Sequence, residues 1–271
     1  MSVTTAPART AGPSAYRLTP RGVLVSEWTK FWSLRSTWIT LTVSVFLLIL
    51  IGVVASASSS PGGEGPGSNT SDGPGLALSG STFAALAVGI LGVLLAAGEY
   101  TTGMIRSTLA AVPARLPVLW SKALIAGGIA AVTMTVGALV SFLIGSPLAP
   151  ESTAGTGLDD DGVLRALLNA GLYLGLVAVL GVALGMIVRS SAGGIAILVG
   201  TLLIVPTLTS LLPASWSDAI TPILPSRAGD GMTALHTPDG VHGPWGSFLV
   251  ITAWVVAALA GAAWRLRKTD A

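Results

Sequence analysis

The sequence predicts an all-α polytopic membrane protein, a six-transmembrane-helix bundle with an N-terminal amphipathic interfacial helix. Of its 271 residues 52% are hydrophobic and only 10% are charged, whereas a soluble domain carries about 25% charged residues. So few charges cannot cover a surface that faces water. The apolar positions form continuous runs without the period-two alternation of a transmembrane β-strand. Because the backbone must be hydrogen-bonded internally in lipid, helices are expected.

Six stretches are long enough to span a bilayer as helices, which takes about 20 mostly apolar residues. Their approximate ranges are 38–57, 76–98, 120–146, 164–188, 193–213 and 244–264. None has a charged residue or histidine in its middle, which disfavours a proton pump or an ion-coupled carrier. The fourth stretch carries Gly171, Gly175, Gly181 and Gly185, at the spacing that lets helices approach closely in lipid.

The distribution of charges predicts the orientation of the chain. Lysine and arginine gather in the N-terminal segment, the loop between spans two and three, the turn after span four and the C-terminus. Only Arg165 and Arg227 fall on the opposite side. The positive-inside rule therefore predicts a multi-pass membrane protein with both termini in the cytoplasm. A rival reading takes Ala55–Ala57 as a signal-peptidase site, but the preceding apolar stretch is longer than a signal peptide requires.

Residues 1–17 are predicted to form a disordered cytoplasmic tail, and residues 18–271 a single transmembrane domain. Thr19 and Pro20 suit the cap and first position of a helix. On that helix one face is apolar and the other is polar, an arrangement typical of helices in the membrane interface. The apolar face holds Leu24, Trp28, Phe31 and Trp32, and the polar face holds Ser26, Thr29, Lys30 and Ser33. A plain juxtamembrane linker is the alternative.

Three connections have distinct predicted structures. Residues 58–75 are rich in glycine, serine and proline, which indicates a flexible outer loop. Met104–Val112 favours a short cytoplasmic helix that ends before Pro113, since the residue before proline disfavours helix. Residues 214–243 mix apolar residues with prolines, which predicts short helices against the outer face.

The sequence lacks the motifs of several catalytic classes. It has no cysteine, which excludes disulfides and thiolate metal sites. It has no phosphate-binding Gly-x-x-x-x-Gly-Lys-Ser/Thr loop, so the chain is not expected to be an enzyme or to hold a cofactor. His236, His242 and the run Asp159–Asp161 favour solvated loops over metal ligands. The basic residues lie beside spans rather than in a nucleic-acid surface. A subunit driven by a partner and a passive scaffold both remain.

Three stretches resemble the permease subunits of ABC-2 type bacterial ABC transporters. The first is Leu-Val-Ser-Glu-Trp-Thr-Lys at 24–30, followed by Leu-Arg-Ser-Thr-Trp at 34–38. The second and most specific is Glu-Tyr-Thr-Thr-Gly at 99–103, followed by Arg106, Pro113, Arg115 and Lys122. The third is the weaker Leu-Pro-Ser at 224–226.

The resemblance implies a permease with a cytoplasmic coupling helix in the loop between spans two and three. It implies a separate ABC ATPase that binds ATP and Mg²⁺, and a second permease subunit, identical or related. The implied coupling-loop residues are Glu99, Thr101, Gly103, Arg106, Thr108, Pro113 and Arg115. The implied interfacial-helix residues are Leu24, Trp28, Lys30, Phe31 and Trp32. Arg106 and Arg115 would bind acidic residues of the ATPase or lipid phosphates, or only satisfy the positive-inside rule. The expected function is export of a drug, peptide, lipid or polymer, and the alternative is a scaffold or regulatory protein without a transported substrate.

Overall fold

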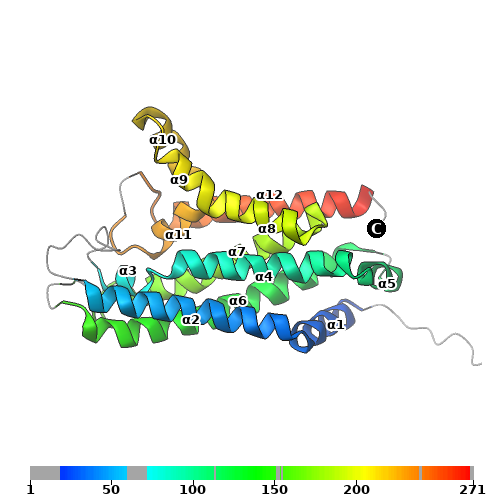
Figure 1. The fold of residues 1–271 in the computed structure, drawn as a ribbon, viewed down its shortest axis with the longest axis horizontal. Coiled ribbons are helices and arrows are strands. Elements are labelled where there is room, and N and C mark those ends of the chain that lie inside the picture. The colour runs from blue at the N-terminus through cyan, green and yellow to red at the C-terminus, as the bar shows by residue number, and fades with distance from the viewer. Residues whose placement is uncertain are drawn as a thin grey trace, which may run out of the picture.

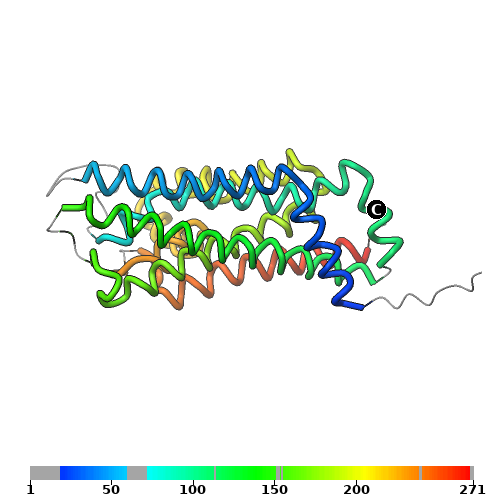
Figure 2. Tube along the Cα trace, turned by 90° about the horizontal axis from the view of Figure 1, so that it is seen from below, coloured from blue at the N-terminus to red at the C-terminus, as the bar shows by residue number. Residues whose placement is uncertain are grey.

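The structure is an elongated bundle in which every regular element is helical. The computed structural model describes residues 19–59, 72–112, 114–150, 153, 155–237 and 240–268. The long helices run side by side along one axis, as Figures 1 and 2 show. One end carries α1 (Pro20–Ser33), α5 (Met104–Ala111) and the last turns of α12 (Pro244–Lys268), and is called the termini end. The opposite end, with α3 (Gly73–Ala77) and the long connections, is called the loop end.

Six helical segments of the described chain are long and apolar enough to cross a membrane, as the sequence predicts. They are α2 (Arg35–Ser58), α4 (Ser81–Thr101), α6 (Leu116–Gly145) with η1 (Ser146–Leu148), α7 (Val163–Val188), the run of α8 (Ser191–Val199), η2 (Gly200–Ile204) and α9 (Val205–Thr209), and α12. The segment count and approximate positions follow from apolar length alone.

The second span differs from its predicted range of 76–98. Residues 73–77 form the separate helix α3, which Asp72 caps by accepting a hydrogen bond from the Gly75 amide at 2.8 Å. A turn follows, and α4 begins only at Ser81. The turn has a tertiary cause, because Gly80 lies directly against the backbone of Leu47 and Leu48 on α2. The predicted loop 58–75 is thus helical at its end, and its residues 60–71 lie outside the described part.

Helix α7 occupies the centre of the bundle and has the largest buried share of the six segments. The glycines that the sequence marks as close-approach positions are the points where α7 contacts its neighbouring helices. Gly171 and Gly175 lie against Ala131 of α6, and Gly181 lies against the carbonyl of Gly89 on α4. Because glycine has no side chain, the backbones of the neighbouring helices approach closely at these positions. The resulting van der Waals packing stabilises helix association in lipid.

The fifth segment has the smallest buried share of the six. It is predicted to reach residue 213, but it ends at Thr209 and turns before α10 (Ala214–Ile220). Its middle section η2 is π-helical and ends at Ile204, and Pro206, which has no N–H to donate, is the second residue after it. Proline and π-turns are established causes of bends, and Figure 1 shows α9 and α10 diverging from the bundle.

The predicted connecting helices are present. The loop after the fifth segment forms α10, η3 (Thr221–Ile223) and α11 (Pro225–Thr233). Two side chains of α7 hold α11 in place: Asn169 Nδ2 donates to the Met232 carbonyl at 2.9 Å, and Arg165 Nη2 donates to the Ala234 carbonyl at 3.1 Å. Helix α1 begins where predicted, with the Thr19 hydroxyl oxygen accepting from the Gly22 amide at 3.2 Å. The predicted tail, residues 1–17, lies outside the described chain.

Candidate functional site at the termini end

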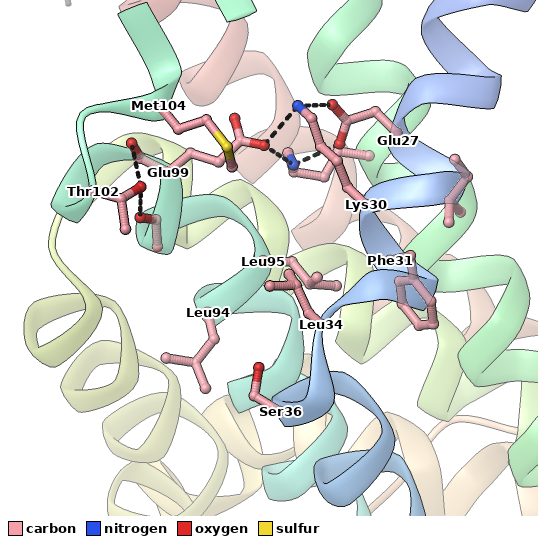
Figure 3. A pocket seen from close by; sticks show the side chains of 13 residues that line it. Glu27, Lys30, Phe31, Leu34, Ser36, Leu94, Leu95, Glu99, Thr102 and Met104 are labelled. Atoms are coloured by element: carbon pink, nitrogen blue, oxygen red, sulfur yellow. Dashed lines mark hydrogen bonds and ion pairs between the residues drawn. The ribbon is translucent and has the colours of Figure 1, made fainter.

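Four charged side chains from three helices meet at the termini end (Figure 3). Lys30 of α1 places its Nζ 2.7 Å from Glu27 Oε1 on the same helix and 3.0 Å from Glu99 Oε1 at the end of α4. Lys122 of α6 places its Nζ 2.6 Å from Glu27 Oε2 and 2.9 Å from the same Glu99 Oε1. We call Glu27, Lys30, Glu99 and Lys122 the ion cluster.

The ion cluster is buried and electrically balanced. The side chains of Glu27, Glu99 and Lys122 are only 4%, 4% and 5% exposed, and that of Lys30 is 25% exposed. Two carboxylates face two ammonium groups, so the formal charges cancel. Removing one member of a buried pair leaves its partner uncompensated at a cost of about 3–5 kcal/mol. The arrangement therefore favours one packing of α1 against α4 and α6.

The two members of the ion cluster on α1 have pKa values that are shifted in opposite directions. Burial alone would raise the pKa of Glu27, but the charges and hydrogen bonds of Lys122 and Lys30 hold its pKa below the ordinary value of 4.5. Burial alone would lower the pKa of Lys30, but Glu27 and Glu99 hold its pKa above the ordinary 10.5. Both groups are therefore charged across the neutral range.

The ion cluster also contacts the short helix α5. Lys30 Nζ donates to Thr108 Oγ1 at 3.3 Å. Helix α5 begins directly after Gly103, whose φ of +73° is a left-handed conformation that glycine adopts without strain. Ile105 is buried on the inner face of α5. One ammonium group thus joins α1, α4 and α5.

A pocket of about 310 Å³ lies beside the ion cluster. The four charged residues form one side of it, and its apolar walls come from α1, α4, the start of α5, α6 and the residue between α1 and α2. Figure 3 shows most of these side chains. The apolar lining consists mainly of Phe31, Leu34, Leu94, Leu95, Met104 and Ile125. An apolar cavity with a few convergent polar groups is the usual form of a small-molecule site.

A helix, α1, is present where the interfacial helix is predicted, but the face that it buries is not the predicted apolar face. Val23, Glu27 and Phe31 face the bundle, while Trp28 is 48% exposed. Leu24 and Trp32 are partly buried. Lys30 is expected on the polar face of this helix, and it points into the ion cluster because its carboxylate partners lie on the bundle side.

The predicted coupling-loop residues that the structure describes divide into two groups, those with contacts inside the bundle and those that are exposed. Glu99 and Thr108 meet at Lys30, and Arg115 Nη1 donates to the Leu266 carbonyl of α12 at 3.1 Å. Thr101, Gly103 and Arg106 are exposed around the start of α5. Pro113 lies outside the described residues. The predicted short helix is present as α5 and ends at Ala111.

Sequence reasoning missed Glu27 and Lys122 as members of the cluster. In the sequence, Glu27 is only part of a motif, and Lys122 is part of a motif and of the positive charge bias. The available signal was weak: Glu27 and Lys30 are three positions apart, which suits a pair on one helix. The long-range partners are 69 and 95 residues apart, a separation that periodicity cannot bridge.

Comparisons with known proteins do not assign the chain to a family. No family model matches the chain, and a search of curated proteins finds no match. Within the described ranges no group of three or more histidine, aspartate or glutamate side chains is arranged to hold a metal ion.

Proposed function

We propose that the chain is the membrane-spanning permease subunit of an ABC-2 type ABC transporter, an exporter in a bacterial plasma membrane. A separate ATPase subunit would bind ATP and Mg²⁺ and drive alternating access, and a second permease subunit would complete the translocation path. The resemblance of residues 24–38 and 99–122 to such permeases is the starting point. The observation that carries the proposal is the contact of Lys30 with both α5 and the end of α4.

Helix α5 has the features expected of a docking element for a cytoplasmic partner. It lies outside the spanning segments at the end where the basic residues gather. Ile105 anchors it to the bundle, while Met104, Arg106 and Ser107 are exposed. An ATPase that shifted α5 would act on Thr108 and, through Lys30, on α1 and α4. Such a shift changes the population of two states only if the partner binds them unequally.

The fifth segment supports the expectation of a second permease subunit. Its outer half packs little against the rest of this chain and exposes large apolar side chains. They are Leu203, Ile204, Val205 and Leu208, and Leu211 and Leu212 in the turn that follows are exposed as well. Lipid or a second subunit would cover this face in the membrane.

Replacement of Arg106 by glutamate tests the assignment of α5. The side chain is exposed, so the fold should tolerate Arg106→Glu, whereas charge reversal should weaken ATPase binding by removing contacts with acidic partner residues. The measurement is isolation from native membranes in mild detergent, with the ratio of co-isolated ABC ATPase to permease determined by mass spectrometry. Arg21→Glu is the matched control, because Arg21 is also exposed at the same end but lies on α1.

The expected result is near-stoichiometric ATPase with the parent chain and Arg21→Glu, and about tenfold less with Arg106→Glu, as for loss of a charged hydrogen bond. Equal recovery of ATPase with all three proteins would remove α5 from the contact. Isolation of the parent chain without any ATPase, under conditions that preserve such complexes, would favour the scaffold or regulatory alternative.

A further inference from the structure

Seven of the eight tryptophans of this chain are exposed, and six of them gather at two levels of the bundle. Tryptophan is enriched at both membrane–water boundaries, because its ring is apolar and its N–H needs a polar partner. At the termini end the exposed rings are those of Trp28, Trp38, Trp120 and Trp264, on α1, α2, α6 and α12. Toward the loop end they are those of Trp216 on α10 and Trp245 at the start of α12. We call these two sets the termini-end ring and the loop-end ring.

Helix α12 carries one tryptophan of each ring on the same face. Trp245 and Trp264 are 82% and 61% exposed, while the opposite face of the helix packs against α7 and α11. The exposed positions between them at helical spacing are all apolar: Leu249, Ala253, Val256 and Ala260. The two tryptophans are about 28 Å apart along the helix, at about 1.5 Å per residue. The hydrocarbon core of a typical bilayer is about 30 Å thick, so this face has the length and composition of a lipid contact.

The hydrogen bonds of the indole N–H groups separate the rings from the tryptophan between them. Trp254 is exposed midway along α12, and its Nε1 donates to the Ile223 carbonyl at 2.9 Å. A polar group in hydrocarbon must find its partner within the protein, whereas water and lipid head groups supply one at the boundary. Within the described chain, five ring tryptophans have no acceptor for Nε1: Trp28, Trp120, Trp216, Trp245 and Trp264. The sixth, Trp38, donates to the Trp32 carbonyl at 3.1 Å. The hydrogen bonding thus suits Trp254 to the hydrocarbon and the rings to its edges.

The charges near the termini-end ring agree with a boundary at this level. Arg265 directly follows Trp264, and Lys268 Nζ lies 4.8 Å from the centre of the Trp264 ring. Lys122 is two residues beyond Trp120 on the bilayer side, where an unpaired charge is costly. Its ammonium group is paired with both carboxylates of the ion cluster. Cations without such partners therefore begin where the ring lies.

We propose that the two tryptophan rings mark where this chain crosses the boundaries of a bilayer with a hydrocarbon core about 28 Å thick, and that the exposed face of α12 between them contacts lipid. The centre of the core crosses α12 close to Trp254, midway between the rings. Trp216 lies at the loop-end boundary on α10, which diverges from the bundle (Figure 1). Its partner there is lipid rather than another part of this chain. The inference goes beyond the proposed function, because it requires neither an ATPase nor transport.

Nitroxide labels on single cysteines measure these depths, because the chain has no cysteine of its own. The labelled variants leave both rings intact: Leu249→Cys, Ala253→Cys, Val256→Cys and Ala260→Cys. Each full-length variant is reconstituted in dioleoylphosphatidylcholine vesicles. Power-saturation EPR then compares collisions of the label with oxygen, which dissolves in hydrocarbon, and with a water-soluble nickel chelate. The ratio of the two collision rates rises with depth.

The four positions form two matched pairs about the expected centre. Leu249 and Ala260 are each four residues from a ring tryptophan, and Ala253 and Val256 are each eight residues from one. The ratios should be equal within each pair, and the second pair should lie about 6 Å deeper. A profile whose centre is displaced by four residues or more would overturn the proposal, because one ring would then lie in water or in hydrocarbon. Labels that neither reagent reaches would also overturn it, since they would show a protein contact in place of lipid.

Two further labels test the loop-end ring away from α12. Trp216→Cys and Asp161→Cys are both exposed toward the loop end. The label at position 161 should collide freely with nickel, and the label at position 216 should have a ratio between those at positions 161 and 249. Equal access of nickel to positions 161 and 216 would place α10 in water. Shielding of position 216 from both reagents would place α10 against a second copy of the chain, and either result would contradict a lipid contact at Trp216.

Discussion

At the scale of single residues, the ion cluster determines how α1 is held. Glu27 and Lys30 are on a helix that the sequence alone assigns to the membrane surface, yet both point into the protein. The sequence shows each charge but not its partner, because the partners come from other helices. The local feature that sequence did predict, the Thr19 cap, depends on residues three positions apart, which is why it was accessible.

The dependence of stability on pH follows from the two pKa shifts on α1. Because the pKa of Glu27 is lowered from 4.5, its stabilisation is complete above that pH and is lost as the pH falls through the folded-state pKa. Because the pKa of Lys30 is raised from 10.5, its stabilisation is complete below that pH and is lost as the pH rises further. Glu27→Gln should therefore lower the melting temperature most at neutral pH, where the lost buried interaction is worth about 3–5 kcal/mol.

Thermal unfolding of detergent-purified parent and Glu27→Gln between pH 3 and pH 9 measures this difference. The two melting temperatures should converge below pH 4.5 and stay apart from pH 6 to pH 9. Asp230→Asn is the control, because its ion pair with Arg227 is about half exposed and exposed pairs contribute about 0–1 kcal/mol. A gap between the parent and Glu27→Gln that did not change with pH would contradict the assigned charge state of Glu27.

At the scale of elements, apolar length predicted the long helices well and failed at their interruptions. The range 164–188 matches α7 to within one residue. The break between α3 and α4 and the π-helical section η2 were not predicted. The first depends on the contact of Gly80 with α2, and the second lies inside an uninterrupted apolar run. A hydropathy profile therefore cannot predict the break between α3 and α4 or the π-helical section η2.

The glycine contacts of α7 give a prediction for helix packing. A Cβ at Gly181 would collide with the carbonyl of Gly89 on α4, so Gly181→Ala must separate the two helices. Overpacking of this kind typically costs about 1–3 kcal/mol, and the melting temperature should fall. Gly128→Ala provides the comparison, because its Cβ has open space and alanine is the better helix former by up to about 1 kcal/mol. A melting temperature for Gly181→Ala equal to that of Gly128→Ala would show that α4 and α7 are not in close contact.

At the scale of the whole molecule, the two ends differ in charge. In the described chain the loop end holds Asp72, the run Asp159–Asp161, Asp218 and Asp230, whereas most lysine and arginine residues lie at the termini end. Among the described residues, the carboxylate side chains at the termini end are those of Glu27 and Glu99, and both are neutralised within the ion cluster. The exposed charge of that end is therefore positive, as expected of a cytoplasmic face.

Cysteine labelling measures the orientation directly, because the chain has no cysteine of its own. Asp161→Cys at the loop end and Ser107→Cys on α5 each introduce one exposed thiol. In intact cells a membrane-impermeant maleimide should label Asp161→Cys at once. Ser107→Cys should react only after the membrane is permeabilised. The reverse pattern would place the termini end outside and would exclude α5 as a contact for a cytoplasmic ATPase.

The ion cluster also determines which lysine amino groups can react with reagents in solution. The lysines of this chain are Lys30, Lys122 and Lys268, and the first two are engaged inside the cluster. Acylating agents that attack uncharged amines should therefore modify Lys268 rapidly and the other two only when α1 moves away from α4 and α6. The rate of acylation at Lys122 is consequently a native reporter of how often this end of the bundle opens.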